Sequence, residues 1–109
     1  MSKPRRSSGS WRERQERDPY VQRARKEGWR SRAVFKLEQI DQKERLLKPG
    51  MVCVDLGSAP GGWSQYLTQK LDGRARIIAT DILPMDALPD VEFIEGDFRE
   101  DEIFQKLLM

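Results

Sequence analysis

The sequence contains no histidine and only one cysteine, and both scarcities limit its chemistry. Histidine is the commonest general base, and histidine and cysteine supply most zinc ligands, so a histidine base and the usual zinc sites are excluded. Cys53 lies within an apolar run and has no partner for an internal disulfide, which predicts a small buried side chain in a reducing compartment. Any catalysis must therefore use lysine, aspartate, glutamate or a bound cofactor, and we expect no metal.

Long apolar runs are also missing. Nothing in the sequence approaches the roughly 18 apolar residues of a membrane span, and no apolar signal-peptide core follows the basic start. Charged residues make up 35% of the 109 residues and apolar residues 38%, a balance typical of one modest soluble domain. We therefore expect a cytoplasmic protein without a membrane partner.

Charge is distributed unevenly along the chain. Residues 1–32 hold eleven Lys/Arg and four Asp/Glu, a net of +7, whereas residues 33–109 carry a net of −5. A basic arm on a mildly acidic body indicates a polyanionic partner, although a solubilising tail would have the same composition. We divide the chain accordingly into a basic arm, residues 1–32, and a folded domain, residues 33–109.

The basic arm combines polar and aromatic signals. Residues 1–10 are too polar to order themselves, and residues 18–28 predict a helix that starts at an Asp-Pro pair and stops at a glycine. Three aromatic residues lie among its arginines: Trp11, Tyr20 and Trp29. Aromatic rings beside guanidinium groups suit RNA, where rings stack on bases and arginines meet phosphates. The same rings could equally pin the arm to the body.

A second helix of about a dozen residues is predicted after Ser31, which we place at its N-cap. Ala33, Leu37 and Ile40 form an apolar stripe at helical spacing. Lys36 lies at the edge of that stripe. The ordinary interpretation of such a lysine is a stem on the core with its ammonium group in water.

The rest of the chain alternates between strand and helix patterns. The expected elements are a strand ending near residue 56, a helix over 63–71, strands over 76–81 and 91–96, and a helix from residue 99. A strand, a glycine-rich turn, a helix and a second strand form a βαβ unit with both strands parallel in one sheet. The sequence therefore predicts an α/β fold.

The turn D-L-G-S-A-P-G-G-W-S, residues 55–64, follows the first strand directly. Ligands of parallel sheets bind beyond the carboxyl ends of the strands, and glycines let the backbone approach a ligand closely. We therefore expect a small molecule over residues 57–63. The spacing G-x-x-x-G-G differs from the dinucleotide fingerprint and lacks the Lys-Ser/Thr of a phosphate loop, which disfavours NAD and ATP.

Two aspartates follow the next two strands. Asp81 ends the second strand, where a dinucleotide-type fold places the carboxylate that holds a ribose diol. Asp97 follows the third strand in the same way, and a ribose and an exocyclic amine are suitable groups for two such acceptors. Each aspartate could instead cap the helix that follows it.

Four motifs together resemble the FtsJ/RrmJ family over roughly residues 11–109. They are S-R-A-V-F-K-L, then L-K-P-G-M-V-C-V-D-L-G-S-A-P-G-G-W-S-Q-Y-L, then D-I-L-P-M-D, and finally G-D-F. The resemblance implies the N-terminal half of a Rossmann-like S-adenosylmethionine-dependent methyltransferase, a parallel sheet with helices on both faces. It also implies 2′-O-methylation of a uridine ribose, with ribosomal RNA or the large ribosomal subunit as partner.

The resemblance also assigns roles to residues. Gly61 and Trp63 match family positions at the methionine end of the cofactor, Asp81 matches the ribose contact and Asp97 the adenine contact. Lys36 matches the first lysine of a Lys-Asp-Lys-Glu set that lines the methyl-transfer site, so the catalytic interpretation overtakes the ordinary one.

The remaining three members of that set have no match in these residues. We therefore expect a truncated methyltransferase that is inactive alone, with a first strand whose open edge favours aggregation. The alternative is a non-catalytic RNA-binding or cofactor-binding half-site. A nicotinamide-dependent oxidoreductase fragment is disfavoured by the glycine spacing and by Trp63.

Overall fold

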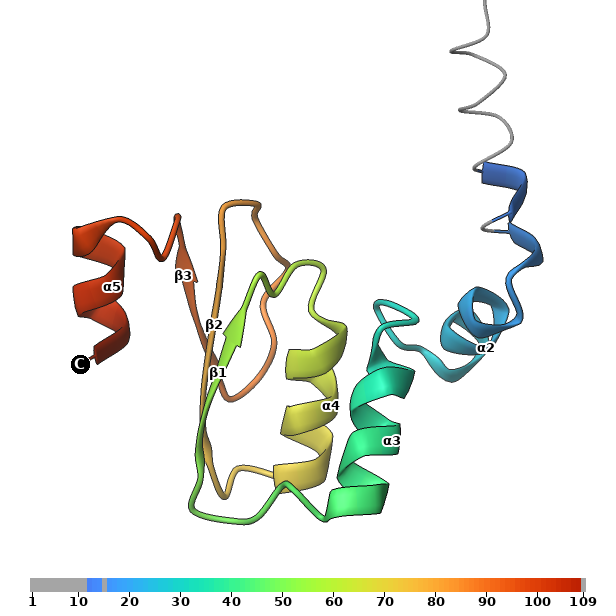
Figure 1. Cartoon of the computed structure of the whole chain (residues 1–109), viewed down its shortest axis with the longest axis horizontal. Coiled ribbons are helices and arrows are strands. Elements are labelled where there is room, and N and C mark those ends of the chain that lie inside the picture. The colour runs from blue at the N-terminus through green and yellow to red at the C-terminus, as the bar shows by residue number, and fades with distance from the viewer. Residues whose placement is uncertain (1–11, 15, 109) are drawn as a thin grey trace, which may run out of the picture.

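The computed structural model describes residues 12–14 and 16–108, so the predictions for residues 1–10 and Trp11 lie outside the described residues. Its elements are α2 (Pro19–Glu27), α3 (Val34–Glu44), β1 (Val52–Leu56), α4 (Gly62–Leu71), β2 (Arg76–Asp81), β3 (Val91–Glu95) and α5 (Asp101–Leu108). The strands form one parallel sheet in the order β1-β2-β3, with α3 and α4 on one side and α5 on the other (Figure 1). The predicted α/β class is confirmed.

The register of the sheet assigns each side chain to a face. Val54 is aligned with Ile78 of β2, and Ile78 with Glu92 of β3. Because side chains alternate along a strand, Cys53 and Ile77 share the other face, where both pack against the helical core. Cys53 is only half-buried, less than the sequence predicted, because β1 is the edge strand of the described sheet. Burial still raises the pKa of its thiol.

Helix α3 differs from its prediction at the start. Ala33 rather than Ser31 is the N-cap, and the Ser31 hydroxyl instead accepts a hydrogen bond from the Ala33 N–H at 3.1 Å in the turn before the helix. The buried residues of α3 are Val34, Phe35, Leu37 and Asp41, while Ala33 is exposed and Ile40 half-buried. The predicted stripe is therefore partly wrong, because α2 packs beside Phe35 and shifts the buried side of the helix.

Helix α2 and the short segment after it pack onto this same core through apolar and aromatic residues. Ala24 is buried in the cluster, and Trp29 packs against it with its ring 6.1 Å from the ring of Tyr66. Tyr20 remains 45% exposed, with its ring 6.0 Å from that of Phe35. Of the two interpretations of these aromatics, the one that pins the arm to the body is supported for Trp29 and Tyr20.

Two capping predictions for the helices are confirmed. The Asp18 carboxylate accepts from the backbone N–H of Tyr20 at 2.7 Å, closes the start of α2, and is ion-paired with Arg32. Helix α2 ends at Gly28, which is in the left-handed conformation with a φ of 82°. Helix α4 begins one residue before its prediction, β3 ends one residue earlier and α5 begins two residues later.

A buried polar contact joins α3 and α4. The Tyr66 hydroxyl donates to an Asp41 carboxylate oxygen at 2.9 Å, and the other oxygen accepts from the Leu47 backbone N–H at 3.0 Å. Burial, followed by the hydrogen bond to Asp41, raises the pKa of Tyr66 to about 12, so its phenol stays protonated. The contact fixes α3 against α4, and α4 in turn carries the glycine turn. None of the helices in the described ranges is long and apolar enough to cross a bilayer.

Candidate functional site

The glycine turn leaves β1 beside the end of β2. The backbone N–H groups of Gly57 and Ser58 both donate to the carbonyl of Thr80, at 2.8 and 3.0 Å. Gly57 has a φ of +71°, and a Cβ added there would meet nothing within 4 Å. The bare backbone expected over a ligand is therefore present at Gly57, which needs glycine for its conformation and faces open space.

Gly61 is bare for a different reason. It forms the N-cap of α4 with a φ of +116°, and an added Cβ would lie 3.0 Å from both Arg30 Nη1 and Met85 Sδ. Gly61 is buried, and its missing side chain makes room for the chain's own residues. The structure thus separates two uses of glycine that the sequence grouped together: an open cradle at Gly57 and a close packing contact at Gly61.

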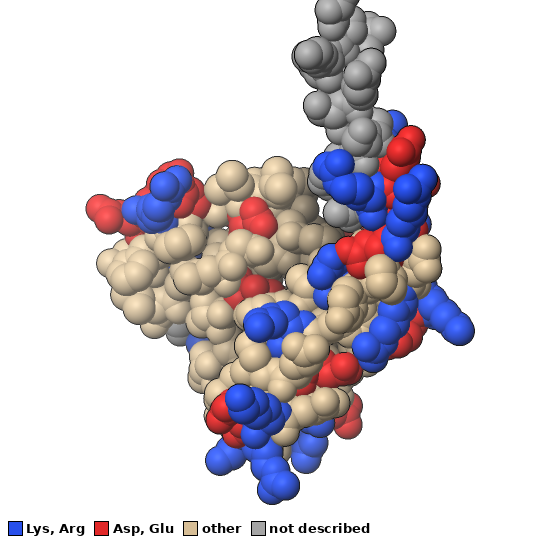
Figure 2. Space-filling view, turned by 45° about the vertical axis from the view of Figure 1, so that its right-hand side comes forward, with Lys and Arg blue, Asp and Glu red and all other residues tan. Residues whose placement is uncertain are grey.

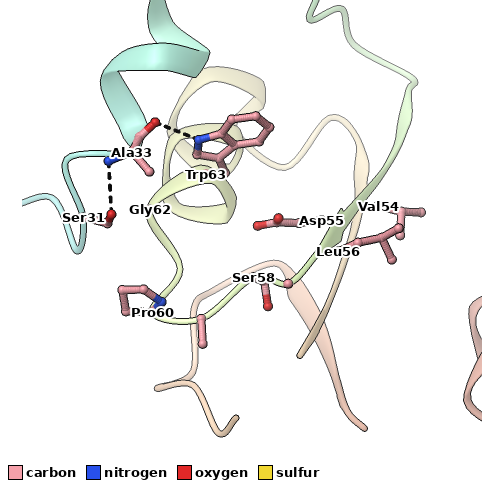
Figure 3. Close-up of a pocket in the computed structure, with 11 residues that line it drawn as sticks. Ser31, Ala33, Val54, Asp55, Leu56, Ser58, Pro60, Gly62 and Trp63 are labelled. Atoms are coloured by element: carbon pink, nitrogen blue, oxygen red, sulfur yellow. Dashed lines mark hydrogen bonds between the residues drawn. The ribbon is translucent and has the colours of Figure 1, made fainter. Parts of the chain in front are cut away.

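A first cavity of about 340 Å³ lies between β1 and the start of α4. Trp63 lines it, is 39% exposed, and donates its indole N–H to the Ala33 carbonyl at 2.7 Å. Figure 3 shows the Asp55 carboxylate directed into the space between Trp63 and Ser58. The lining residues are Ser31, Ala33, Val54, Asp55, Leu56, Gly57, Ser58, Ala59, Pro60, Gly62 and Trp63.

Asp55 and Ser58 are site candidates that the sequence reasoning missed. Asp55 is 9% exposed, accepts a hydrogen bond from the Ser64 hydroxyl at 2.7 Å, and has a raised pKa because its carboxyl group is buried. The Ser58 hydroxyl is buried and has no hydrogen-bond partner within the described part of the chain. The available signal was position: Asp55 lies at the end of β1 as Asp81 lies at the end of β2.

A second cavity of about 360 Å³ adjoins Gly57 on the other side and contains both predicted aspartates. Asp81 already joins two segments, because its carboxylate accepts from the Ala59 N–H at 2.9 Å and the Leu83 N–H at 3.0 Å. These backbone donors, Leu83 first, lower the pKa of Asp81 and keep it ionised. The lining residues are Gly57, Thr80, Asp81, Ile82, Gly96, Asp97, Phe98 and Arg99.

Asp97 is held by a local partner. Arg99 Nη2 lies 2.6 Å from a carboxylate oxygen of Asp97, and the Arg99 backbone N–H also donates to Asp97 at 2.9 Å. Arg99 lowers the pKa of Asp97 to about 2. The side chain of Arg99 is 79% exposed, so it can turn away and leave the carboxylate as an acceptor.

The structure brings Trp63, Asp81 and Asp97 to the two cavities that meet at Gly57, while Gly61, within the turn, is buried and lines neither cavity. Lys36 is exposed on α3 and is not among the residues that line either cavity. Over the described ranges, no group of three or more Cys, Asp or Glu side chains is arranged to hold a metal ion. The site therefore offers three carboxylates, a free hydroxyl and an exposed indole around a bare glycine.

Comparisons with known proteins give this arrangement a family. A model of the FtsJ-like methyltransferase family matches residues 29–109. A relative from Legionella pneumophila (strain Corby), named ribosomal RNA large subunit methyltransferase E, is 60% identical over 102 residues, which cover 94% of this chain and 50% of the relative. A relative of the same name from Alcanivorax borkumensis is 54% identical over 111 residues, covering 100% of this chain and 53% of the relative.

A solved structure of a ribosomal RNA methyltransferase from Plasmodium falciparum superposes with a TM-score of 0.63 at 36% identity, covering 68% of this chain and 41% of that one. The chain spans about half the length of the curated relatives that it matches. This confirms the prediction that the chain corresponds to only part of a family member. The sheet, the glycine turn and the matched residues lead to one conclusion: the chain belongs to the FtsJ-like methyltransferase family.

Proposed function

We propose that the two cavities beside Gly57 form one binding site for S-adenosylmethionine. The observation that carries this proposal is the open space over Gly57. This space lies between the second cavity, which contains Asp81 and Asp97, and the first cavity, which contains Trp63. A cofactor with a nucleoside at one end and an amino acid at the other needs this kind of divided site. Gly61 is assigned the methionine end by family resemblance.

The side chains on the nucleoside side fit adenosine. Asp81 has lone pairs free beyond its two backbone donors and would accept from the ribose hydroxyls. Asp97 would accept from the adenine amine. Ile82 and Phe98 are 66% and 39% exposed in the same cavity and would cover the faces of the ring.

The side chains on the other side fit the amino-acid part. Trp63 would pack along the methionine chain, the buried Asp55 carboxylate would receive the ammonium group, and the Ser58 hydroxyl would gain its missing partner. A bound cation would lower the pKa of Asp55 again, because an opposite charge offsets the cost of burying a carboxylate.

We propose 2′-O-methylation of a uridine ribose in large-subunit ribosomal RNA as the activity of the family site to which this chain contributes. Bound S-adenosylmethionine supplies an activated methyl group for displacement by the ribose oxygen. The chain must hold that oxygen in line and favour loss of its proton. Lys36 is exposed on α3, and the N-cap of that helix, Ala33, accepts the hydrogen bond from Trp63. Lys36 would present its ammonium group to the 2′-hydroxyl of the ribose.

RNA binding would use the α2 end of the molecule, in a cytoplasmic setting. Figure 2 shows basic side chains crowded around that end, with some acidic ones among them. Phosphate contacts weaken steeply with salt, so RNA affinity should fall as the salt concentration rises.

The test of the cofactor site is calorimetry with S-adenosylmethionine on the chain and on Asp81→Asn. Asn keeps one acceptor oxygen but loses the charge and one diol contact, so the affinity should fall about tenfold or more. Asp90→Asn is the matched control, because Asp90 directly precedes β3, at the amino-terminal end of the strands, and lines neither cavity. Equal affinity of the chain and Asp81→Asn would contradict the assignment.

A non-catalytic half-site remains the second candidate, because only Lys36 of the family's four catalytic positions is matched here. This chain alone should transfer no methyl group from labelled S-adenosylmethionine to large ribosomal subunits while still binding the cofactor. Measurable transfer would contradict the half-site interpretation and support the full enzyme activity.

A further inference from the structure

Arg30 joins two segments that are far apart in the sequence. Its Nη1 donates to the carbonyls of Pro60 at 3.1 Å and Asp86 at 2.6 Å, and its Nη2 donates to the carbonyl of Ala87 at 3.0 Å. One guanidinium therefore holds the glycine turn and the loop after β2 together. The function proposed above gives Arg30 no role.

The backbone that carries Arg30 is itself fixed. The Arg30 N–H donates to the side-chain oxygen of Gln65 at 2.9 Å, and the Gln65 side-chain nitrogen donates to the Gly28 carbonyl at 2.9 Å. Gln65 lies within α4, so the segment before α3 is held against the helix that the glycine turn opens. The side chain of Arg30 therefore extends to the loop from a backbone segment that is hydrogen-bonded to α4.

The two segments held by Arg30 are also the two that Asp81 joins. The Asp81 carboxylate accepts from Ala59, in the glycine turn, and from Leu83, in the loop. Met85 of the loop and Arg30 both lie 3.0 Å from the place where Gly61 would have a Cβ. The spacing between turn and loop therefore depends on Arg30 as well as on Asp81.

We infer that Arg30 is a positioning residue for the nucleoside side of the binding site: it holds the loop against the glycine turn and so fixes the orientation of Asp81. This inference rests on the proposed cofactor site. Nη1 of the planar fork donates to both segments while Nη2 holds the loop at a second carbonyl, and the shorter side chain of lysine, with a single nitrogen, cannot make all three contacts. Shape, in addition to charge, is therefore required at position 30.

The test compares three variants of this chain: Arg30→Lys, Arg30→Met and Arg25→Met. Arg25 is exposed on α2, so its replacement removes the same charge from the same arm without touching the turn. Both Arg30 variants should weaken S-adenosylmethionine binding about tenfold in calorimetry, and Arg25→Met should leave it unchanged. Binding to large-subunit ribosomal RNA at fixed salt should fall equally in Arg30→Met and Arg25→Met.

Hydrogen exchange provides a readout that needs no ligand. The amides of Ala59 and Leu83 should exchange about tenfold faster in Arg30→Met than in Arg25→Met, because the segments around Asp81 open more often. A fourth variant, Arg30→Ala, allows chemical rescue: added ethylguanidinium should restore its cofactor affinity and ethylammonium should not, a difference that a merely destabilised fold would not show.

The outcomes separate the inference from the function on which it rests. If the unaltered chain binds no S-adenosylmethionine, the proposed cofactor site fails and this inference fails with it. If the chain binds but Arg30→Lys binds equally well, or if exchange at Ala59 and Leu83 does not change in Arg30→Met, only the role of Arg30 is overturned.

Discussion

Strands β1 and β2 are both apolar runs of a parallel sheet, yet they are buried very differently. Ile77, Ile78, Ala79 and Thr80 of β2 are at most 2% exposed, whereas Val52, Val54 and Leu56 of β1 are 63%, 46% and 50% exposed. The difference follows from position, because the three exposed residues of β1 share one face at the edge of the described sheet, whereas β2 has a strand on each side. Hydrophobicity shows what a strand can bury, and its neighbours decide what it does bury.

The largest effect should come from shortening the central strand. Ile78→Ala removes a side chain that is 1% exposed, and the lost burial plus the cavity should cost about 2 to 5 kcal/mol of unfolding free energy. Val54→Ala, at the aligned position on β1, should cost less than about 1 kcal/mol. Urea unfolding of both variants measures the comparison directly, and equal losses would show that β1 is covered in solution.

The packing of α3 against α4 can be destabilised through a polar contact instead. Tyr66→Phe removes the hydroxyl that donates to Asp41 and leaves a buried carboxylate with one donor fewer, at a cost of about 1 to 3 kcal/mol. Thr68→Val, which removes a hydroxyl that bonds only one helical turn back along α4, is the control and should cost less. A loss no greater than that of the control would mean that Asp41 finds another donor.

Asp55 of β1 should make the stability of the chain depend on pH. Burial raises its pKa, so the folded chain holds this proton more tightly than the unfolded chain does, and the contribution of Asp55 to stability falls as the pH rises from about 3.8 through the raised pKa. Asp55→Asn should therefore be more stable than the unaltered chain at neutral pH, by less than the two effects above, while binding S-adenosylmethionine more weakly. Thermal unfolding from pH 3 to pH 8 measures the first effect; a variant less stable at every pH would contradict it.

The smallest effect on stability should come from the open face of β1. Val54→Thr keeps the branched shape of the side chain and should change the unfolding free energy by less than about 0.5 kcal/mol. It should, however, reduce the self-association expected of an apolar strand edge. Sedimentation at several concentrations measures this, with Ile77→Val as a core control; unchanged association would place the contact elsewhere.

The predictable part of the fold came from periodic patterns and glycines. The parallel strands, the turn and the aspartates at two strand ends follow from local signals, because each signal lies within one short segment. The role of Arg30 could not be predicted, since its acceptors at Asp86 and Ala87 lie far along the chain. The buried side of α3 was misjudged for the same reason: a neighbour distant in sequence, α2, decides it.

Site residues divide in the same way. Asp81 and Asp97 were found because an acid after a strand is a recognisable pattern, and both line the second cavity. Asp55 was missed because it lies inside the apolar strand, one residue before its end, where an acid is harder to recognise as a site residue than one at the very end. Lys36 came only from the family resemblance, and its role in methyl transfer stays a prediction.

The indole of Trp63 gives the chain an optical reporter. Its ring lies at the cavity wall and its N–H is held by the Ala33 carbonyl, so a ligand entering beside it would change its fluorescence without unfolding the chain. Trp29 packs beside Tyr66 in the core and would respond to unfolding instead. A variant with Trp11 and Trp29 replaced by phenylalanine would report ligand binding through Trp63. A variant with Trp11 and Trp63 replaced would report folding through Trp29.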